Sequence, residues 1–171
     1  MKKILYFWLV VFSIITYKAQ STTWNGSSWS NGRPNTSTDA IISADYSQSA
    51  NLTVKNLTIN SGINFTLKSN FQVIVYGSVV NNGTLIVESN ASFVHRDNAS
   101  TYSGSGTALV KREANLKRND YNYWSSQVAN QNIYNFSIGT PTKYFFKYNE
   151  KDDRFYANEI TASSTFELGT G

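Results

Sequence analysis

The sequence predicts an all-β protein, a right-handed β-helix (β-solenoid) of about three rungs followed by a partial second β-unit. Apolar residues recur at every second position along short segments, as in strands that bury one face. Asn, Ser and Gly turn signals separate these segments, and one block of sequence repeats after about 20 residues, the length of a solenoid turn. The competing fold is a two-sheet β-sandwich with regular hairpins.

Composition narrows the classes of function. Aromatic and charged residues each make up 15% of the 171-residue chain. An ordinary domain has roughly 25% charged residues. A chain this aromatic and this weakly charged is not expected to be disordered. The formal charge of +4 depends on three lysines before residue 20, so it does not indicate nucleic acid as a partner. The chain has no Cys and one His, His95, which excludes disulfides, thiol nucleophiles and His-cluster metal sites. We expect no enzyme activity, no cofactor and no bound metal.

Residues 1–19 are predicted to be a signal peptide. Lys2 and Lys3 form a positively charged start, and the apolar run 4–16 follows. This run fits the core of a signal peptide and is shorter than the ~20 apolar residues that span a bilayer. We expect cleavage after Ala19 and no membrane span once the signal is removed. An uncleaved membrane anchor is the alternative.

Residues 20–49 are predicted to form an N-terminal cap region. The segment is rich in Ser, Thr, Asn and Gly. Its pairs Asn25-Gly26 and Asn31-Gly32 mark turns, because both residue types tolerate positive φ. The exposed end rung of a solenoid needs such a cover.

Residues 50–110 are predicted to form the solenoid. The stretch 67–75 aligns with 87–95 one repeat later, and the period-two alternation places Gln72 on the outer face. The inward residues in this register are Leu67, Val73, Val87 and Phe93.

Residues 111–171 are predicted to be a partial C-terminal β-unit that follows a polar loop at 98–106. Strands at 142–148 and 155–160 form a hairpin across the charged turn 150–154. Two strands alone bury too little apolar surface to be stable in water. The sequence stops soon after an apolar Phe-x-Leu pair, so we expect this unit to be truncated.

Several segments together resemble the N-terminal regions of large cell-surface and secreted proteins exported by the type IX secretion system. The resemblance rests on the Trp-Asn-Gly-rich opening 24–34 with the strand 38–42, the β-repeats of 51–96, and the stretches 110–112 and 120–128. It covers nearly all of the chain after the predicted signal. It implies a β-helix, a secreted or outer-surface location and an adhesin-like role.

One position departs from the pattern of that family. Where the family usually shows an aromatic residue and then Trp-Ser-Ser-Pro-Val, this chain has Gln127 in place of the proline. Replacing the proline affects our expectation for the local turn and for no other part of the chain. Family members normally continue for hundreds of residues to a C-terminal sorting domain, which this sequence does not contain.

Four aromatic residues are candidate ligand-binding residues, as stacking platforms for glycans: Trp24, Trp29, Tyr121 and Trp124. For Trp24 and Trp29 the alternative is that they plug the open end of the solenoid. For Tyr121 and Trp124, with Tyr123 between them, the alternative is packing inside the C-terminal unit.

The acidic residues do not predict catalysis or a metal site. Glu150, Asp152 and Asp153 fall in one charged turn, where we expect a solvated hairpin tip. Glu88 is the sole acid of the β-repeats, which argues against polysaccharide lyase chemistry. His95 aligns with an inward position, and we interpret it as structural.

We therefore expect a non-enzymatic, secreted or cell-surface, adhesin-like structural protein. Its expected partners are glycans or other cell-surface components. The alternative function is a carbohydrate-binding module of a larger secreted polysaccharide-degrading enzyme.

Overall fold

The computed structural model describes residues 20–126, 130–157 and 160–166. The predicted signal peptide lies outside the described residues. The chain divides into two compact units, Met1–Glu113 and Ala114–Gly171, and each is considered by itself.

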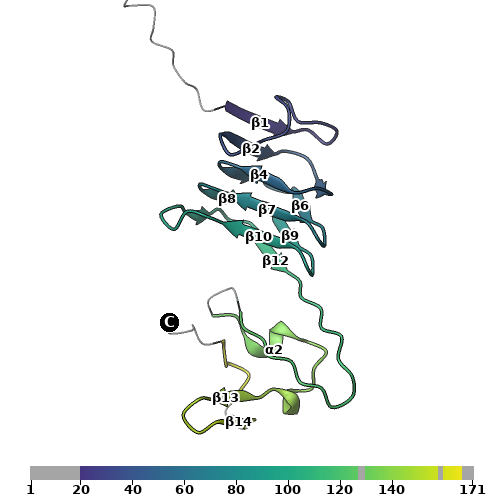
Figure 1. Ribbon diagram of the computed structural model, residues 1–171, viewed down its shortest axis with the longest axis vertical. Coiled ribbons are helices and arrows are strands. Elements are labelled where there is room, and N and C mark those ends of the chain that lie inside the picture. The colour runs from purple at the N-terminus through teal and green to yellow at the C-terminus, as the bar shows by residue number, and fades with distance from the viewer. Residues whose placement is uncertain (1–19, 127–129, 158–159, 167–171) are drawn as a thin grey trace, which may run out of the picture. The chain divides into compact units, whose positions relative to one another are not determined.

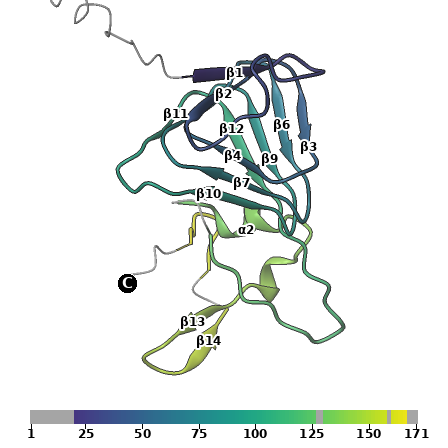
Figure 2. The ribbon, with the colours of Figure 1, turned by 45° about the horizontal axis from the view of Figure 1, so that its top comes forward.

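The first unit is a β-solenoid of about five turns, in which three parallel sheets enclose one core (Figure 1 and Figure 2). The five-stranded sheet contains β1 (Gln20–Trp24), β2 (Thr38–Ile42), β5 (Leu57–Ile59), β8 (Val79–Asn81) and β11 (Tyr102–Ser103). The four-stranded sheet contains β3 (Tyr46–Gln48), β6 (Asn64–Leu67), β9 (Thr84–Val87) and β12 (Thr107–Val110). The three-stranded sheet contains β4 (Leu52–Val54), β7 (Gln72–Val75) and β10 (Ser92–His95).

The register confirms the repeat found in the sequence. Leu67 pairs with Val87, and Val73 pairs with Phe93, all in parallel strands one turn apart. Hairpins join antiparallel strands, so this parallel pairing is that of a solenoid and not of a β-sandwich with hairpins.

The solenoid extends further in both directions than the sequence indicates. The predicted cap region supplies β1, β2 and β3, which pair within the same sheets as the later strands. The predicted loop at 98–106 contains β11. Ala40 pairs with Leu57 but Val79 pairs with Tyr102, so the number of residues per turn changes along the chain. A search for one fixed period therefore misses the outer turns.

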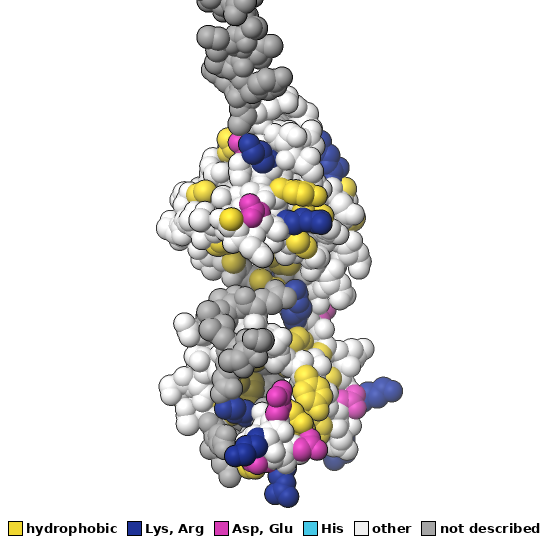
Figure 3. Space-filling model, turned by 60° about the vertical axis from the view of Figure 1, so that its left-hand side comes forward, with side chains coloured by type: hydrophobic (Ala, Val, Ile, Leu, Met, Phe, Trp, Pro, Cys, Tyr) yellow, Lys and Arg dark blue, Asp and Glu magenta, His cyan; other side chains and the backbone are white. Residues whose placement is uncertain are grey.

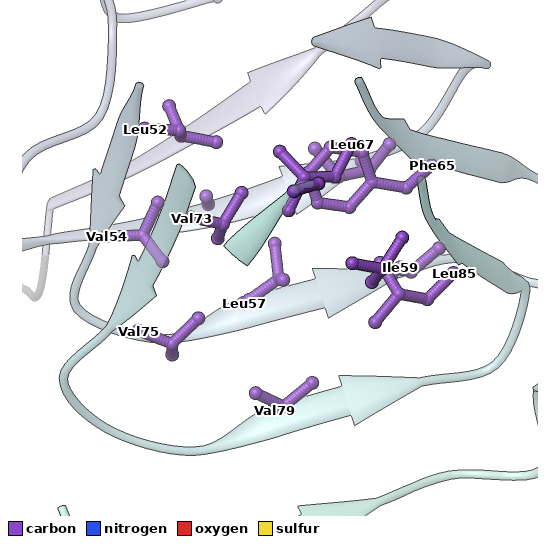
Figure 4. Close-up of a cluster of buried hydrophobic side chains, with 14 residues drawn as sticks. Leu52, Val54, Leu57, Ile59, Phe65, Leu67, Val73, Val75, Val79 and Leu85 are labelled. Atoms are coloured by element: carbon purple, nitrogen blue, oxygen red, sulfur yellow. The ribbon is translucent and has the colours of Figure 1, made fainter. Parts of the chain in front are cut away.

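The core is a stack of aliphatic side chains with one phenylalanine, Phe65 (Figure 4). Leu67, Val73 and Val87 are buried as predicted. Phe93 packs against the core but is only partly buried, because β10 is the last strand of its sheet. The fully buried apolar residues include Ile42, Leu52, Val54, Leu57, Ile59, Phe65, Val75 and Val79.

Asparagine and glycine turn the corners between sheets. Asn70 and Asn90 occupy the same corner one turn apart, with φ of 68° and 62°. This left-handed region is one that Asn tolerates better than most residues. Gly83 lies at another corner, where a Cβ atom would be 2.3 Å from the carbonyl oxygen of Ile63. These residues are the turn signals of the sequence, and they alternate with the strands.

The second unit contains short elements and a hairpin. They are α2 (Ile133–Phe136), the 3₁₀ helix η1 (Thr142–Tyr144), β13 (Lys147–Asn149) and β14 (Arg154–Tyr156). The predicted hairpin is confirmed, because Tyr148 pairs antiparallel with Phe155. Its strands are shorter than predicted: Pro141 precedes a helical turn in which Tyr144 N–H donates to the Pro141 carbonyl.

Candidate functional site

The N-terminal end of the solenoid carries an aromatic cluster that we call the end cluster: Trp24, Trp29, Tyr46 and Phe65. The ring centroids of Trp24 and Trp29 are 5.7 Å apart, and that of Tyr46 lies 4.6 Å from Trp24 and 5.5 Å from Trp29. Tyr46 stacks in turn on the buried ring of Phe65. The two tryptophans are half-buried and pack against the core.

Backbone contacts fold the chain over this end. β1 is the first strand of its sheet, and an antiparallel bridge joins Trp24 to Trp29 just beyond it. Ser30 N–H donates to the Thr23 carbonyl at 3.0 Å, and Trp24 Nε1–H donates to the Asp45 carbonyl at 3.1 Å. The indole donor of Trp24 is thus satisfied within the protein, as the end-plug interpretation requires. Sequence reasoning missed Tyr46, which links the pair to the core.

The candidate aromatics of the second unit lie mostly at its surface. Tyr121 is 72% exposed and contacts the ring of Phe146 at 5.7 Å between centroids. Tyr123 is 76% exposed, whereas Trp124 is 37% exposed and contacts Phe136 at 5.2 Å. Trp124 is therefore partly packed inside the unit, whereas Tyr121 and Tyr123 are not. The structure brings Tyr121 and Trp124 into this second unit, whereas Trp24 and Trp29 belong to the first.

The carboxylates of the hairpin tip hold the hairpin together. Asp153 Oδ1 accepts a hydrogen bond from the Tyr148 hydroxyl at 2.6 Å, and Asp152 Oδ2 accepts one from the Tyr156 hydroxyl at 3.2 Å. The first of these bonds raises the pKa of Tyr148 above its ordinary value of 10.0. Among the described residues, no group of three or more His, Cys, Asp or Glu side chains is placed to hold a metal ion.

The two polar residues considered for catalysis have structural partners. His95 is half-buried, and its Nε2 lies 2.6 Å from the Gly77 carbonyl oxygen. Glu88 forms an ion pair with Lys111 one turn later, at 2.8 Å. The structure places the two residues on different sheets: His95 ends β10, and Glu88 follows β9.

Asp45 also joins successive turns of the solenoid. The backbone N–H of Asn64 donates to Asp45 Oδ1 at 2.8 Å, and the side-chain amide of Asn64 adds a longer contact. These bonds hold the pKa of Asp45 below its ordinary value of 3.8, the backbone bond contributing most.

Sequence reasoning also missed a row of side chains beside the three-stranded sheet. Lys55, Tyr76 and Arg96 each directly follow one of its strands, on three successive turns. The Arg96 guanidinium carbon lies 5.6 Å from the centroid of the Tyr76 ring. An alignment of the three successive turns that continued one residue past each strand would have placed Lys55, Tyr76 and Arg96 in one column.

Residues 16–171 match a family model described as "Domain of unknown function (DUF8693)". The chain belongs to this family. No curated protein and no solved structure gave a significant match. In the described part of this DUF8693 chain, no helix is long and apolar enough to cross a bilayer.

In this DUF8693 chain, four of the polar residues considered for chemistry join turns or strands: Glu88, His95, Asp152 and Asp153.

Proposed function

We propose that the protein is a non-enzymatic structural module, secreted or on the outer cell surface, with an adhesin-like role. The observation that carries this proposal is the continuous core of the first unit. Inward side chains of successive turns stack from β2 through β9, and parallel backbone pairing joins each turn to the next.

The physics of a solenoid suits the task of a spacer. Each turn contacts its neighbours alone, and each adds about 4.8 Å of length along the axis. The end cluster closes the exposed edge of the first turn, which otherwise invites pairing with other chains. Such a structure holds a surface away from its point of attachment without disulfides, of which the chain has none.

The proposed location rests on the sequence. The charged and then apolar N-terminal segment is typical of export signals, and the resemblance to type IX secretion substrates supports the same location. Labelling intact cells with a membrane-impermeant amine reagent tests it, together with mass spectrometry of the medium. We expect labelled Lys68 and Lys117, both exposed, before lysis. Labelling that requires lysis, with no protein in the medium, would contradict the proposal.

A second candidate function has one observation in its favour. Tyr121 and Tyr123 are largely exposed residues, as stacking platforms for sugars are. On this alternative the chain is a carbohydrate-binding module of a larger secreted polysaccharide-degrading enzyme. Replacing both tyrosines with alanine then abolishes binding to a neutral glycan, whereas the spacer function predicts no change.

The absence of catalysis is tested by turnover on a panel of polysaccharides and proteins. We expect none, because Glu88 and His95 are engaged with Lys111 and Gly77. Turnover that disappears in Glu88→Gln or His95→Ala would overturn the proposal.

A further inference from the structure

The outer face of the three-stranded sheet presents three parallel rows of side chains. The middle row is Thr53, Ile74 and Val94, which are paired in register on β4, β7 and β10. Beside it on one side lie Gln72 and Ser92, also paired. Beside it on the other side lie Lys55, Tyr76 and Arg96, directly after the ends of the strands. We call this surface the three-row face.

The cationic row is exposed and partly ordered before any ligand arrives. Lys55 and Arg96 are exposed, and Tyr76 exposes 39% of its surface. The guanidinium of Arg96 lies over the ring of Tyr76, a cation–π arrangement that restricts the motion of the arginine. Less conformational entropy is then lost when this guanidinium binds an anion.

The nearby acidic residues have other partners. Asp97 Oδ1 accepts a hydrogen bond from Ala99 N–H at 2.9 Å, and Asp39 Oδ1 accepts one from Asn56 Nδ2 at 2.7 Å. Within the described ranges, neither Lys55 nor Arg96 has a carboxylate in ion-pair contact. Both cations are therefore available to an external anion.

The other two sheets lack this combination. On the four-stranded sheet, Lys111 is paired with Glu88. On the five-stranded sheet the middle outward row carries no charge and consists of Thr23, Ile41, Thr58, Val80 and Ser103. The charged residue beside that row, Asp39 on β2, is an acid. Figure 3 shows one face of the first unit, on which a few charged side chains lie among hydrophobic and uncharged polar ones. The positive charge of the three-row face thus comes from two defined side chains, Lys55 and Arg96, and not from a general basic surface.

We propose that the three-row face binds an extended acidic polysaccharide that runs along the solenoid axis. Successive turns are spaced by about 4.8 Å, which is close to the length of one pyranose unit in an extended chain. One sugar can therefore lie against each turn, and the three turns of this face accommodate about three sugars.

Each row matches one part of such a ligand. The Arg96 guanidinium presents paired donors to a carboxylate or sulfate, and Lys55 supplies a second positive charge. Tyr76, together with the middle row, contacts the apolar faces of the sugar rings. The amide of Gln72 and the hydroxyl of Ser92 exchange hydrogen bonds with sugar hydroxyls. This ligand adds to the structural role proposed above, which stands or falls separately.

Calorimetric titration of the purified protein tests the proposal. The probes are oligogalacturonates of increasing length, dextran sulfate as the sulfated arm, the methyl ester of polygalacturonate as the uncharged arm, and polyglutamate as an acidic polymer without sugar rings. We expect oligogalacturonate affinity to rise up to about three sugars and then level off. A preference between oligogalacturonate and dextran sulfate identifies the acidic group.

Variants localise the binding to the three-row face. Lys55→Gln with Arg96→Gln should weaken binding by about tenfold or more, because charge-assisted hydrogen bonds are lost. Tyr76→Ala should weaken it by several-fold. The control Lys68→Gln with Lys117→Gln removes the same charge elsewhere and should change affinity less than about twofold. All three variants should keep the wild-type melting temperature, since the replaced side chains point outward.

Three results would each overturn the proposal: no binding of either acidic polysaccharide, equal binding of the methyl ester or of polyglutamate, or an equal loss in the control variant. Equal binding of polyglutamate would assign the face to acidic polymers in general, including acidic proteins. None of these results affects the spacer function, which is tested by surface labelling and by the stability of the solenoid.

Discussion

At the scale of single residues, the direction in which a side chain points decides its energetic role. Val73 is fully buried, whereas Gln72, one position earlier on β7, lies on the outer face. Val73→Asp should lower the free energy of unfolding by about 3 kcal/mol or more, because it buries an unpaired charge. Gln72→Asp is the control and should cost less than about 1 kcal/mol. Urea unfolding measures both, and equal losses would mean that the register is wrong.

Asp45 gives a prediction about pH. The hydrogen bond from Asn64 N–H keeps the pKa of the folded Asp45 carboxyl below its ordinary value. Its contribution to stability is therefore present above the unfolded-state pKa and is lost as the pH falls through the folded pKa. Asp45→Asn should make stability less dependent on pH in the acid range, measured as the slope of unfolding free energy against pH. An unchanged slope would contradict this role.

Not every inward residue can be predicted from alternation. Asn81 is polar yet buried, because its Nδ2 donates to the Thr107 carbonyl at 3.0 Å and its Oδ1 accepts from Gly83 N–H at 3.1 Å. The sequence indicates a turn there, but it does not show that the asparagine bonds a strand on the following turn. Gln48 is likewise the last residue of its strand, β3, and is buried. Its Nε2 donates to the Gln72 carbonyl oxygen.

At the scale of elements, the corners limit which residues are tolerated. At Gly83 a Cβ atom would lie 2.3 Å from the Ile63 carbonyl oxygen and 2.5 Å from that of Asn60, both backbone atoms. Gly83→Ala should therefore destabilise the solenoid by about 2 kcal/mol. At Gly139 a Cβ atom meets nothing within 4 Å, so Gly139→Ala should be nearly neutral. Thermal unfolding compares the two, and a neutral Gly83→Ala would refute the close stacking of these corners.

The pairing of strands also explains which parts of the candidate site could be predicted from the sequence. Trp24 and Trp29 were identified because tryptophan is conspicuous in a polar segment. Tyr46 was missed, because its place beside them depends on the parallel pairing of β3 with β6. The row of Lys55, Tyr76 and Arg96 was missed for a related reason: these residues belong together through register, and no local motif marks them.

At the scale of the whole chain, the two units differ in burial. In the described part of the second unit no side chain is buried, and several aromatic rings are exposed. Exposed apolar patches promote association. The protein should therefore associate more strongly than a version that ends at Arg118. Light scattering of both at equal concentration measures this, and a monomeric, protease-resistant longer protein would show that the second unit is stable as it is.

Residues 20–113 contain one continuous solenoid, and the proposed spacer function requires that it be stable along its length. Hydrogen exchange measured by mass spectrometry tests it most directly, because protection reports the stability of each backbone hydrogen bond. Protection from exchange should extend from β2 through β9 without a gap. It should also be greater there than in the second unit. Rapid exchange in β2 and β3, with protection confined to the central repeats, would contradict the claim.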